Sequence, residues 1–179
     1  MIDLQQFCGI ETEIREWMLK PWSHGGRTYG TNGHILVRCN GDAEPKAHRR
    51  PAKVPKKIDA NIDAASGGTV AAIPALPPIV VCLNCKGSGF DEESDDWTCP
   101  HCIHGYIPAP VWIGGSRFLL EYITKISQLP GVVFRTNGKN VAAHFTFDGG
   151  DGIVMPIKET EADIEYESWV AQLTGADRD

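Results

Sequence analysis

The chain has 179 residues and a formal net charge of −6, with 42% hydrophobic and 22% charged residues. This composition is ordinary for a soluble globular protein with one core of moderate size, or one domain plus a module. The acidic balance argues against the whole molecule being a nucleic-acid binder. No apolar stretch in the sequence is long enough to span a bilayer, so we expect no membrane partner.

The first residues and the scattered cysteines indicate the cellular compartment. Met1 to Gln6 contain no basic segment followed by an apolar run, so we expect no signal peptide. Cys8 and Cys39 lie apart from the other four cysteines. Reduced thiols in the cytosol are the simplest account of them, and we expect a cytoplasmic protein.

The first forty residues predict a short helix followed by a three-stranded meander. Ile2–Cys8 has the pattern of one or two helical turns, with Asp3 as the cap. Ile14–Trp22 and Arg27–Gly30 flank the sequence Ser-His-Gly-Gly, which favours a hairpin. Ile35–Cys39 follows a second turn and completes the meander.

Residues 41–80 contain six of the twelve prolines, so we expect an extended connector there. A short helix near Asp59–Ser66 is the exception, and Gly67-Gly68 would end it. The apolar run Ile79–Val81 then leads into a cysteine-rich segment.

A basic run lies within this connector. Six cations and no acidic residue occur between positions 46 and 57, namely Lys46, Arg49, Arg50, Lys53, Lys56 and Lys57. Such a run can contact the phosphates of DNA. A solvated linker is the alternative that we favour, because prolines interrupt the run and aromatic residues are absent.

The cysteine-rich segment carries the most specific pattern in the chain. Two Cys-x-x-Cys pairs, Cys82 to Cys85 and Cys99 to Cys102, are separated by 13 residues. Four thiolates at this spacing can form a tetrahedron, the geometry that Zn²⁺ accepts with Zn–S distances of about 2.3 Å. We therefore expect one structural zinc ion with the ligands Cys82, Cys85, Cys99 and Cys102.

Glycines that follow the two pairs support this interpretation. Gly87, Gly89 and Gly105 allow positive φ angles, which direct backbone N–H groups at the sulfurs. The alternatives are a redox dithiol, two disulfides or unrelated buried cysteines, but a redox pair normally occurs singly in a βα unit. Zinc is favoured over iron by availability. We expect His101 and His104 to be exposed turn residues, because four thiols already complete the site.

After this segment the chain continues through Ile107–Ile113 into a second set of elements. Apolar residues recur at helical spacing over Ser116–Gln128, and Ser116 is the expected N-cap. Three strands should follow, and Asn137-Gly138 is a strong hairpin signal between the first two. Their expected ranges are Gly131–Thr136, Val141–Asp148 and Gly152–Ile157, and an acidic helix over Glu161–Leu173 should end the chain.

The order of elements indicates an internal repeat. A helix and three strands come first, and a strand, a helix and three strands follow the insertion. We expect an α+β fold in which each half forms a sheet and both helices lie on one side. The predicted units are residues 1–40 and 108–158 for the two halves, 41–80 for the connector, 81–107 for the zinc insert, and 159–179 for the acidic helix and tail.

Two resemblances to known families follow from these segments. The sequence Cys82-Leu-Asn-Cys85-Lys-Gly-Ser-Gly89 resembles the repeat of DnaJ-type zinc domains. Separately, Arg27-Thr-Tyr-Gly-Thr-Asn-Gly-His-Ile-Leu-Val37 and Gly115–Ile157 resemble one domain of the bacterial DNA polymerase sliding clamp. The second resemblance implies a (β-α-β-β-β)2 domain. A bacterial clamp chain has three such domains, whereas this chain has one, with a zinc-knuckle hairpin inserted and a C-terminal helix added.

The clamp resemblance also implies a partner groove. In clamps, a Met-Pro-Met-like end borders the groove that receives peptide motifs of polymerases. Met155, Pro156 and Ile157 match that end by position, although this chain continues past them.

These features predict a non-enzymatic, zinc-containing interaction protein with a sliding-clamp-like domain. A phage or mobile-element factor would suit it, acting in DNA replication or engaging a host complex as an inhibitor or mimic. The alternatives are a nucleic-acid-binding zinc protein that uses the basic run and a DnaJ-like chaperone adaptor. An enzyme is least supported, because His24, His34 and His144 occur singly and no nucleophile–base pair or phosphate loop is evident. We expect a protein partner, with DNA possible, and a monomer or small dimer.

Overall fold

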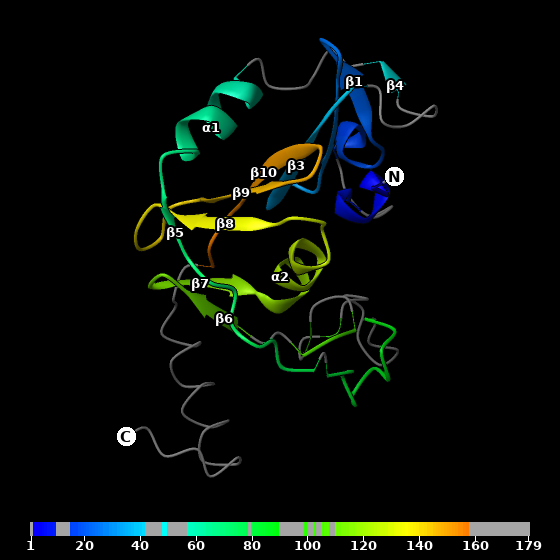
Figure 1. Cartoon of the computed structure of the whole chain (residues 1–179). Coiled ribbons are helices and arrows are strands. Elements are labelled where there is room, and N and C mark those ends of the chain that lie inside the picture. The colour runs from blue at the N-terminus through cyan, green and yellow to red at the C-terminus, as the bar shows by residue number, and fades with distance from the viewer. Residues whose placement is uncertain are drawn as a thin grey trace.

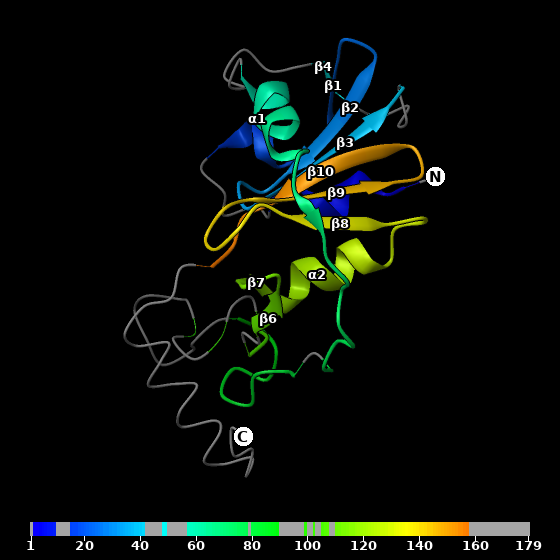
Figure 2. The same ribbon diagram turned by 60° about the vertical axis from the view of Figure 1, so that its left-hand side comes forward.

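The two halves of the chain join into one sheet instead of forming one sheet each, because β10 of the second half pairs with β3 of the first (Figures 1 and 2). The computed structural model describes residues 2–9, 15–41, 48–49, 57–78, 80–89, 99, 102, 105–107 and 110–157. Over these residues, eight strands form a sheet in the order β4-β1-β2-β3-β10-β9-β8-β5, and β6 and β7 form a separate hairpin.

The described helices are the 3-10 helices η1 (Leu4–Phe7) and η2 (Glu16–Met18) and the α-helices α1 (Ile58–Ala65) and α2 (Leu120–Ser127). The first half contributes the strands β1 (Trp22–His24), β2 (Arg27–Thr31) and β3 (Ile35–Asn40). The middle of the chain contributes β4 (His48–Arg49) and β5 (Thr69–Val70). The second half contributes β6 (Pro110–Ile113), β7 (Ser116–Leu119), β8 (Val133–Thr136), β9 (Ala143–Phe147) and β10 (Gly150–Val154).

The predicted start of the chain is confirmed in most respects. Asp3 caps η1 and accepts a hydrogen bond of 2.9 Å from the N–H of Gln5. The meander β1-β2-β3 is present, and a two-residue turn with positive φ at both glycines joins its first two strands. The strand expected over Ile14–Trp22 is wrong, because Glu16–Met18 forms a 3-10 turn and β1 begins at Trp22.

The middle of the chain contributes more regular structure than the predicted connector. The helix expected near Asp59–Ser66 is confirmed as α1, whose apolar residues Ile58, Ile62 and Ala65 are buried at helical spacing. The two strands β4 and β5 were not expected, and each adds two residues to one edge of the sheet.

The helix expected over Ser116–Gln128 is correct only in its second part. Gly114 and Gly115 both have positive φ and form the two-residue turn of the β6-β7 hairpin, so Ser116–Leu119 is a strand and α2 begins at Leu120. Ser116 is not an N-cap. Its hydroxyl donates to the carbonyl of Gly138 at 2.9 Å and ties the hairpin to the β8-β9 turn.

The three strands after α2 are confirmed with shifted ends. β9 and β10 are antiparallel neighbours, and β10 also pairs with β3 along its whole length. That β3-β10 pairing is the seam between the two halves. β10 spans Gly150–Val154, so Met155–Ile157 lies beyond the strand that was expected to include it. The predicted helix Glu161–Leu173 lies outside the described residues.

The sheet separates two apolar clusters. On one face, η1, α2 and the β6-β7 hairpin cover a core that includes Phe7, Phe118 and Phe145. On the other face, α1 packs over Trp22, Tyr29 and Leu36 (Figure 1). The predicted placement of the first helix and α2 on one side is thus confirmed. The fold is a mixed helix and sheet structure with a mostly antiparallel, open sheet, as expected for the α+β class.

Candidate metal centre

A short two-stranded ribbon carries the first cysteine pair away from the domain. Val81 and Tyr106 form an antiparallel bridge, with hydrogen bonds from Cys82 N–H to Gly105 O at 2.8 Å and from Ile107 N–H to Val80 O at 2.9 Å. The cysteine-rich segment lies beyond the β6-β7 hairpin, away from the main sheet, in both views (Figures 1 and 2). The ribbon therefore fixes where the two cysteine pairs meet.

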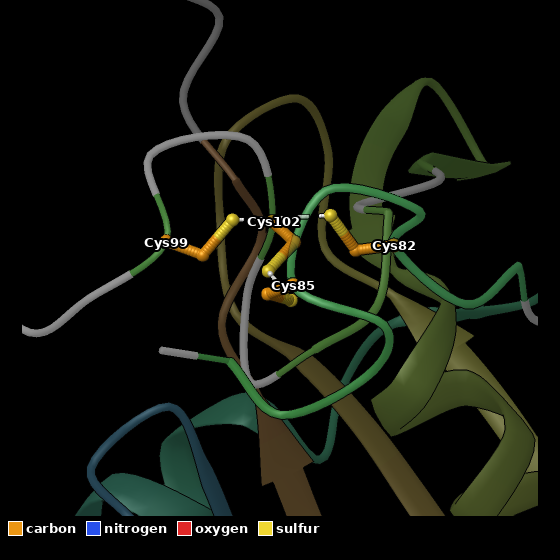
Figure 3. Close-up of side chains that lie close together, drawn as sticks. All are labelled: Cys82, Cys85, Cys99 and Cys102. Atoms are coloured by element: carbon orange, nitrogen blue, oxygen red, sulfur yellow. Dashed lines mark hydrogen bonds between the residues drawn. The ribbon is translucent and has the colours of Figure 1, made fainter. Parts of the chain in front are cut away.

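The four thiols converge on one point (Figure 3). The sulfurs of Cys82 and Cys99 are 3.9 Å apart, those of Cys85 and Cys102 are 3.5 Å apart, and all four lie within 4.8 Å of one another. A tetrahedral Zn²⁺ with Zn–S bonds of about 2.3 Å places its sulfurs about 3.8 Å apart. All four cysteines are free thiols, and these separations are far longer than a disulfide bond of about 2.05 Å. The donor set therefore fits a single metal ion.

Backbone and side-chain donors surround the sulfurs. Gly89 N–H donates to Cys85 Sγ at 3.3 Å, and Asn84 Nδ2 donates to Cys99 Sγ at 3.6 Å. Gly87, Gly89 and Gly105 all have positive φ, as the sequence predicts. Such donors offset the negative charge that four thiolates bring to one ion.

The pKa values of two thiols in the cluster, Cys85 and Cys102, are shifted in opposite directions. Burial alone would raise the pKa of Cys85, but the N–H groups of Gly89 and Gly87 and the neighbouring thiols lower it to about 6. Burial and the hydrogen bonds with Cys85 and Cys99 raise the pKa of Cys102 to about 12. The lowered pKa of Cys85 favours its thiolate, which is the form that a metal ion binds.

The backbone segments that follow the two cysteine pairs approach each other closely at Gly87 and Gly105. A Cβ placed on Gly105 would lie 2.1 Å from the carbonyl oxygen of Gly87. Gly105 also has a φ of +89°, which side chains rarely adopt. Any larger residue at position 105 would therefore separate the two halves of the site.

Two residues of the predicted basic run, Arg49 and Lys57, lie in the described part of the chain. Arg49 lies in β4, whose backbone pairs with Ser23, and Lys57 is exposed just before α1. Lys46, Arg50, Lys53 and Lys56 lie outside the described residues. The nucleic-acid role of the basic run therefore stays a prediction.

The predicted partner segment, Met155–Ile157, is held in place by backbone hydrogen bonds. Met155 N–H donates to His34 O at 2.8 Å, and Ile157 N–H donates to Arg117 O at 2.7 Å. The side chain of Met155 is exposed, whereas Pro156 and Ile157 are half-buried. This segment connects the β2-β3 turn to β7, and its use as a groove stays a prediction.

One charged cluster was not predicted from the sequence. Arg38 lies on β3 with its side chain 8% exposed and contacts the carboxylates of three residues, Asp59, Asp63 and Asp151. His144 lies 3.5 Å from Asp151, and Tyr29 donates to Asp59 at 2.8 Å. The only signal in the sequence is a cation inside the apolar run Ile-Leu-Val-Arg-Cys. This cluster joins α1 to the seam of the sheet.

Comparison with protein-family models, curated proteins and solved structures finds no match to this chain. The clamp and DnaJ resemblances therefore depend only on the segments quoted above. Within the described part of the chain, no helix has the length and apolar character needed to cross a membrane. What the structure does show is a cluster of four cysteines close enough together to hold a metal ion.

Proposed function

We propose that this chain is a non-enzymatic interaction protein in which one structural zinc ion holds a small module on a clamp-like domain. The single observation that carries the proposal is the convergence of four thiols directly beside exposed apolar side chains. Leu83, between the first two cysteines, is 88% exposed, and Val80 and Val81 before them are also exposed. Apolar groups held in water by a metal-fixed segment are typical of a contact surface.

The ligand set supports a structural role for the metal. Four cysteines complete a tetrahedral zinc site and leave no open position for a water molecule or a substrate. Val80, Val81 and Tyr106 of the ribbon are all exposed, so metal binding would supply much of the free energy that orders it. The module is therefore suited to present a surface rather than to perform chemistry.

The domain beneath the module supports the clamp-like part of the proposal. The order β7-α2-β8-β9-β10 is the strand-helix-three-strand unit that the resemblance implies, and β3 and β10 join it to the meander of the first half. The exposed Met155 follows β10 directly, where clamps receive peptides. We propose that the protein acts by protein contact in DNA replication, or by engaging a host complex as a mimic.

An affinity purification with and without nuclease tests this function. The zinc-loaded full chain should retain the same protein partner in both conditions, because the contact is made between proteins. Cys99→Ser should lose the partner, whereas Cys8→Ser should keep it. Cys8 is a buried cysteine on η1's side of the domain, outside the cluster, and is the matched control. A partner that disappears with nuclease would instead favour the nucleic-acid alternative.

A further inference from the structure

The hydrogen-bonding register of the ribbon that carries the cysteine pairs decides which backbone groups face outward. Its two hydrogen bonds join the residues on either side of the Val81–Tyr106 pair, from Cys82 to Gly105 and from Ile107 to Val80. In an antiparallel ribbon, this register makes Val81 and Tyr106 a non-hydrogen-bonded pair. The N–H and C=O of each therefore point outward, toward the two edges of the ribbon.

The edge at Val81 is accessible. Val81 is 46% exposed, its partner Tyr106 is 45% exposed, and Val80 is exposed as well. Within the described residues, no hydrogen bond is made by the backbone N–H or C=O of Val81. An unpaired strand edge of this kind is a template for pairing with another chain.

The side chains along this edge are apolar and carry no charge. Residues 80 to 83 read Val-Val-Cys-Leu, and the cysteine side chain turns toward the metal site. Val80 and Val81 are the exposed apolar residues of the ribbon itself, and Leu83 is exposed in the turn that follows Cys82. The N–H of Val81 is a hydrogen-bond donor and its C=O is an acceptor, and the extended backbone of another chain offers the complementary acceptor and donor. Phosphate groups offer acceptors only.

We propose that the Val81 edge of the ribbon accepts an extended segment of a partner protein as an additional β-strand. The segment would carry an apolar residue opposite Val81, because the side chain of Val81 is apolar and exposed. This inference rests on the proposed interaction function and specifies how that contact is made. The metal would act on the contact indirectly, by holding the ribbon in the register that turns Val81 outward.

Peptides selected from a random library on the immobilised, zinc-loaded full chain provide the probe. The selected sequences should favour extended segments with apolar, β-branched or aromatic residues. A synthetic copy with N-methyl groups on alternate residues should bind about tenfold more weakly, because each methyl removes a backbone donor from the pairing. Selected peptides that bind equally well with and without these methyl groups would overturn the proposal.

Two substitutions of Val81 test whether its backbone N–H is needed for peptide binding without disturbing the fold. Val81→Pro removes an N–H that the ribbon itself does not use, and proline is tolerated on an edge strand whose N–H faces solvent. It should weaken peptide binding by about tenfold while leaving the zinc content unchanged. Val81→Thr keeps the N–H and is the matched control, which should bind within about threefold of the parent chain. Equal binding of the peptide to Val81→Pro and Val81→Thr would overturn the proposal.

Hydrogen exchange offers a second readout with an internal reference. The N–H of Val81 should exchange rapidly in the free protein and slowly with the peptide bound, whereas the N–H of Cys82 is hydrogen-bonded and should be protected in both states. Protection of Val81 in the concentrated free protein would show that a second copy occupies the edge, and would overturn the proposal. The interaction function itself fails by a different result, the absence of any nuclease-resistant partner of the unaltered chain.

Discussion

Arg38 and Asp151 form a paired ion contact across the seam between β3 and β10. The Nε of Arg38 donates to one carboxylate oxygen at 2.8 Å, and its Nη2 donates to the other at 2.7 Å. The same guanidinium also binds Asp59 and Asp63 of α1, both at 3.0 Å. One side chain thus ties together the first half of the chain, the second half and the helix on the outer face.

We expect Arg38→Met to destabilise the fold by about 3 kcal/mol, because removing one partner of a buried pair leaves carboxylates without their counter-charge. Denaturant unfolding measures the change. Lys125→Met is the matched control, since Lys125 pairs with Glu121 on the surface of α2 and its loss should cost about 0.5 kcal/mol. Equal effects of the two substitutions would show that the seam does not depend on Arg38.

We expect the fold to lose stability in acid, because the carboxylate of Asp151 becomes protonated. Burial alone would raise the pKa of this carboxyl group, but hydrogen bonds from His144 and Arg38 lower it to about 2. The folded-state pKa therefore lies below that of the unfolded chain, so the stabilisation is complete above about pH 4 and is lost as the pH falls toward 2. Urea unfolding at several pH values should show a steeper acid loss for the parent chain than for Asp151→Asn. Parallel pH profiles would contradict this assignment.

Purified protein should contain about one zinc ion per chain, because four thiolates saturate a tetrahedral site. Cys99→Ser should release the metal and disorder the ribbon, while the main sheet keeps its structure. Elemental analysis gives the zinc content, and backbone amide spectra distinguish the ribbon from the sheet. Cys8→Ser should retain the zinc. A metal-free parent protein, or full zinc content in Cys99→Ser, would rule out this site.

Gly105→Ala should weaken zinc binding by about tenfold or more, because the added methyl group meets the Gly87 carbonyl and holds the two cysteine pairs apart. Competition with a chromophoric chelator measures the affinity. Gly138→Ala is a suitable control, since Gly138 also has a positive φ but a Cβ there meets no atom within 4 Å. If both variants bind zinc as the parent does, the close packing of Gly87 and Gly105 has no part in the site.

The features that were predicted correctly depend on short stretches of sequence. The spacing of Cys82, Cys85, Cys99 and Cys102 indicates the cluster because the two thiols of each pair are only three residues apart along the chain. The helix α1 and the β1-β2 hairpin follow equally from local apolar spacing and from glycines in a turn. The Gly114-Gly115 turn carried the same kind of signal, but the apolar residues after it fit a helix as well as a strand.

The features that were missed depend on distant contacts. Arg38 lies 21 residues from Asp59 and 113 residues from Asp151 along the chain, so no local pattern indicates that they meet. The strands β4 and β5 are two residues long, and their pairing depends on the edges that β1 and β8 offer. Tertiary structure, rather than propensity, decides such short elements.

The short strands at the two ends of the main sheet bear on the oligomeric state of the protein. Ring formation by a clamp-type domain requires edge strands of neighbouring domains to pair, but β4 and β5 at the two ends are only two residues long. Short edge strands are a common means of preventing edge-to-edge association. We therefore expect a monomer or small dimer in solution, with light scattering as the measurement.

A lysine at the β5 edge tests the same point directly. Val70 is exposed on β5, so Val70→Lys should leave both the fold and the molar mass unchanged if that edge is unused. A charge there would instead break an assembly built by edge pairing, because a lysine in such an interface would be desolvated without a partner. A ring-sized particle that dissociates in Val70→Lys would therefore contradict the monomer or dimer. That result would also favour a ring-forming clamp over the proposed mimic of a host complex. It would not affect the proposals about the metal centre and its ribbon.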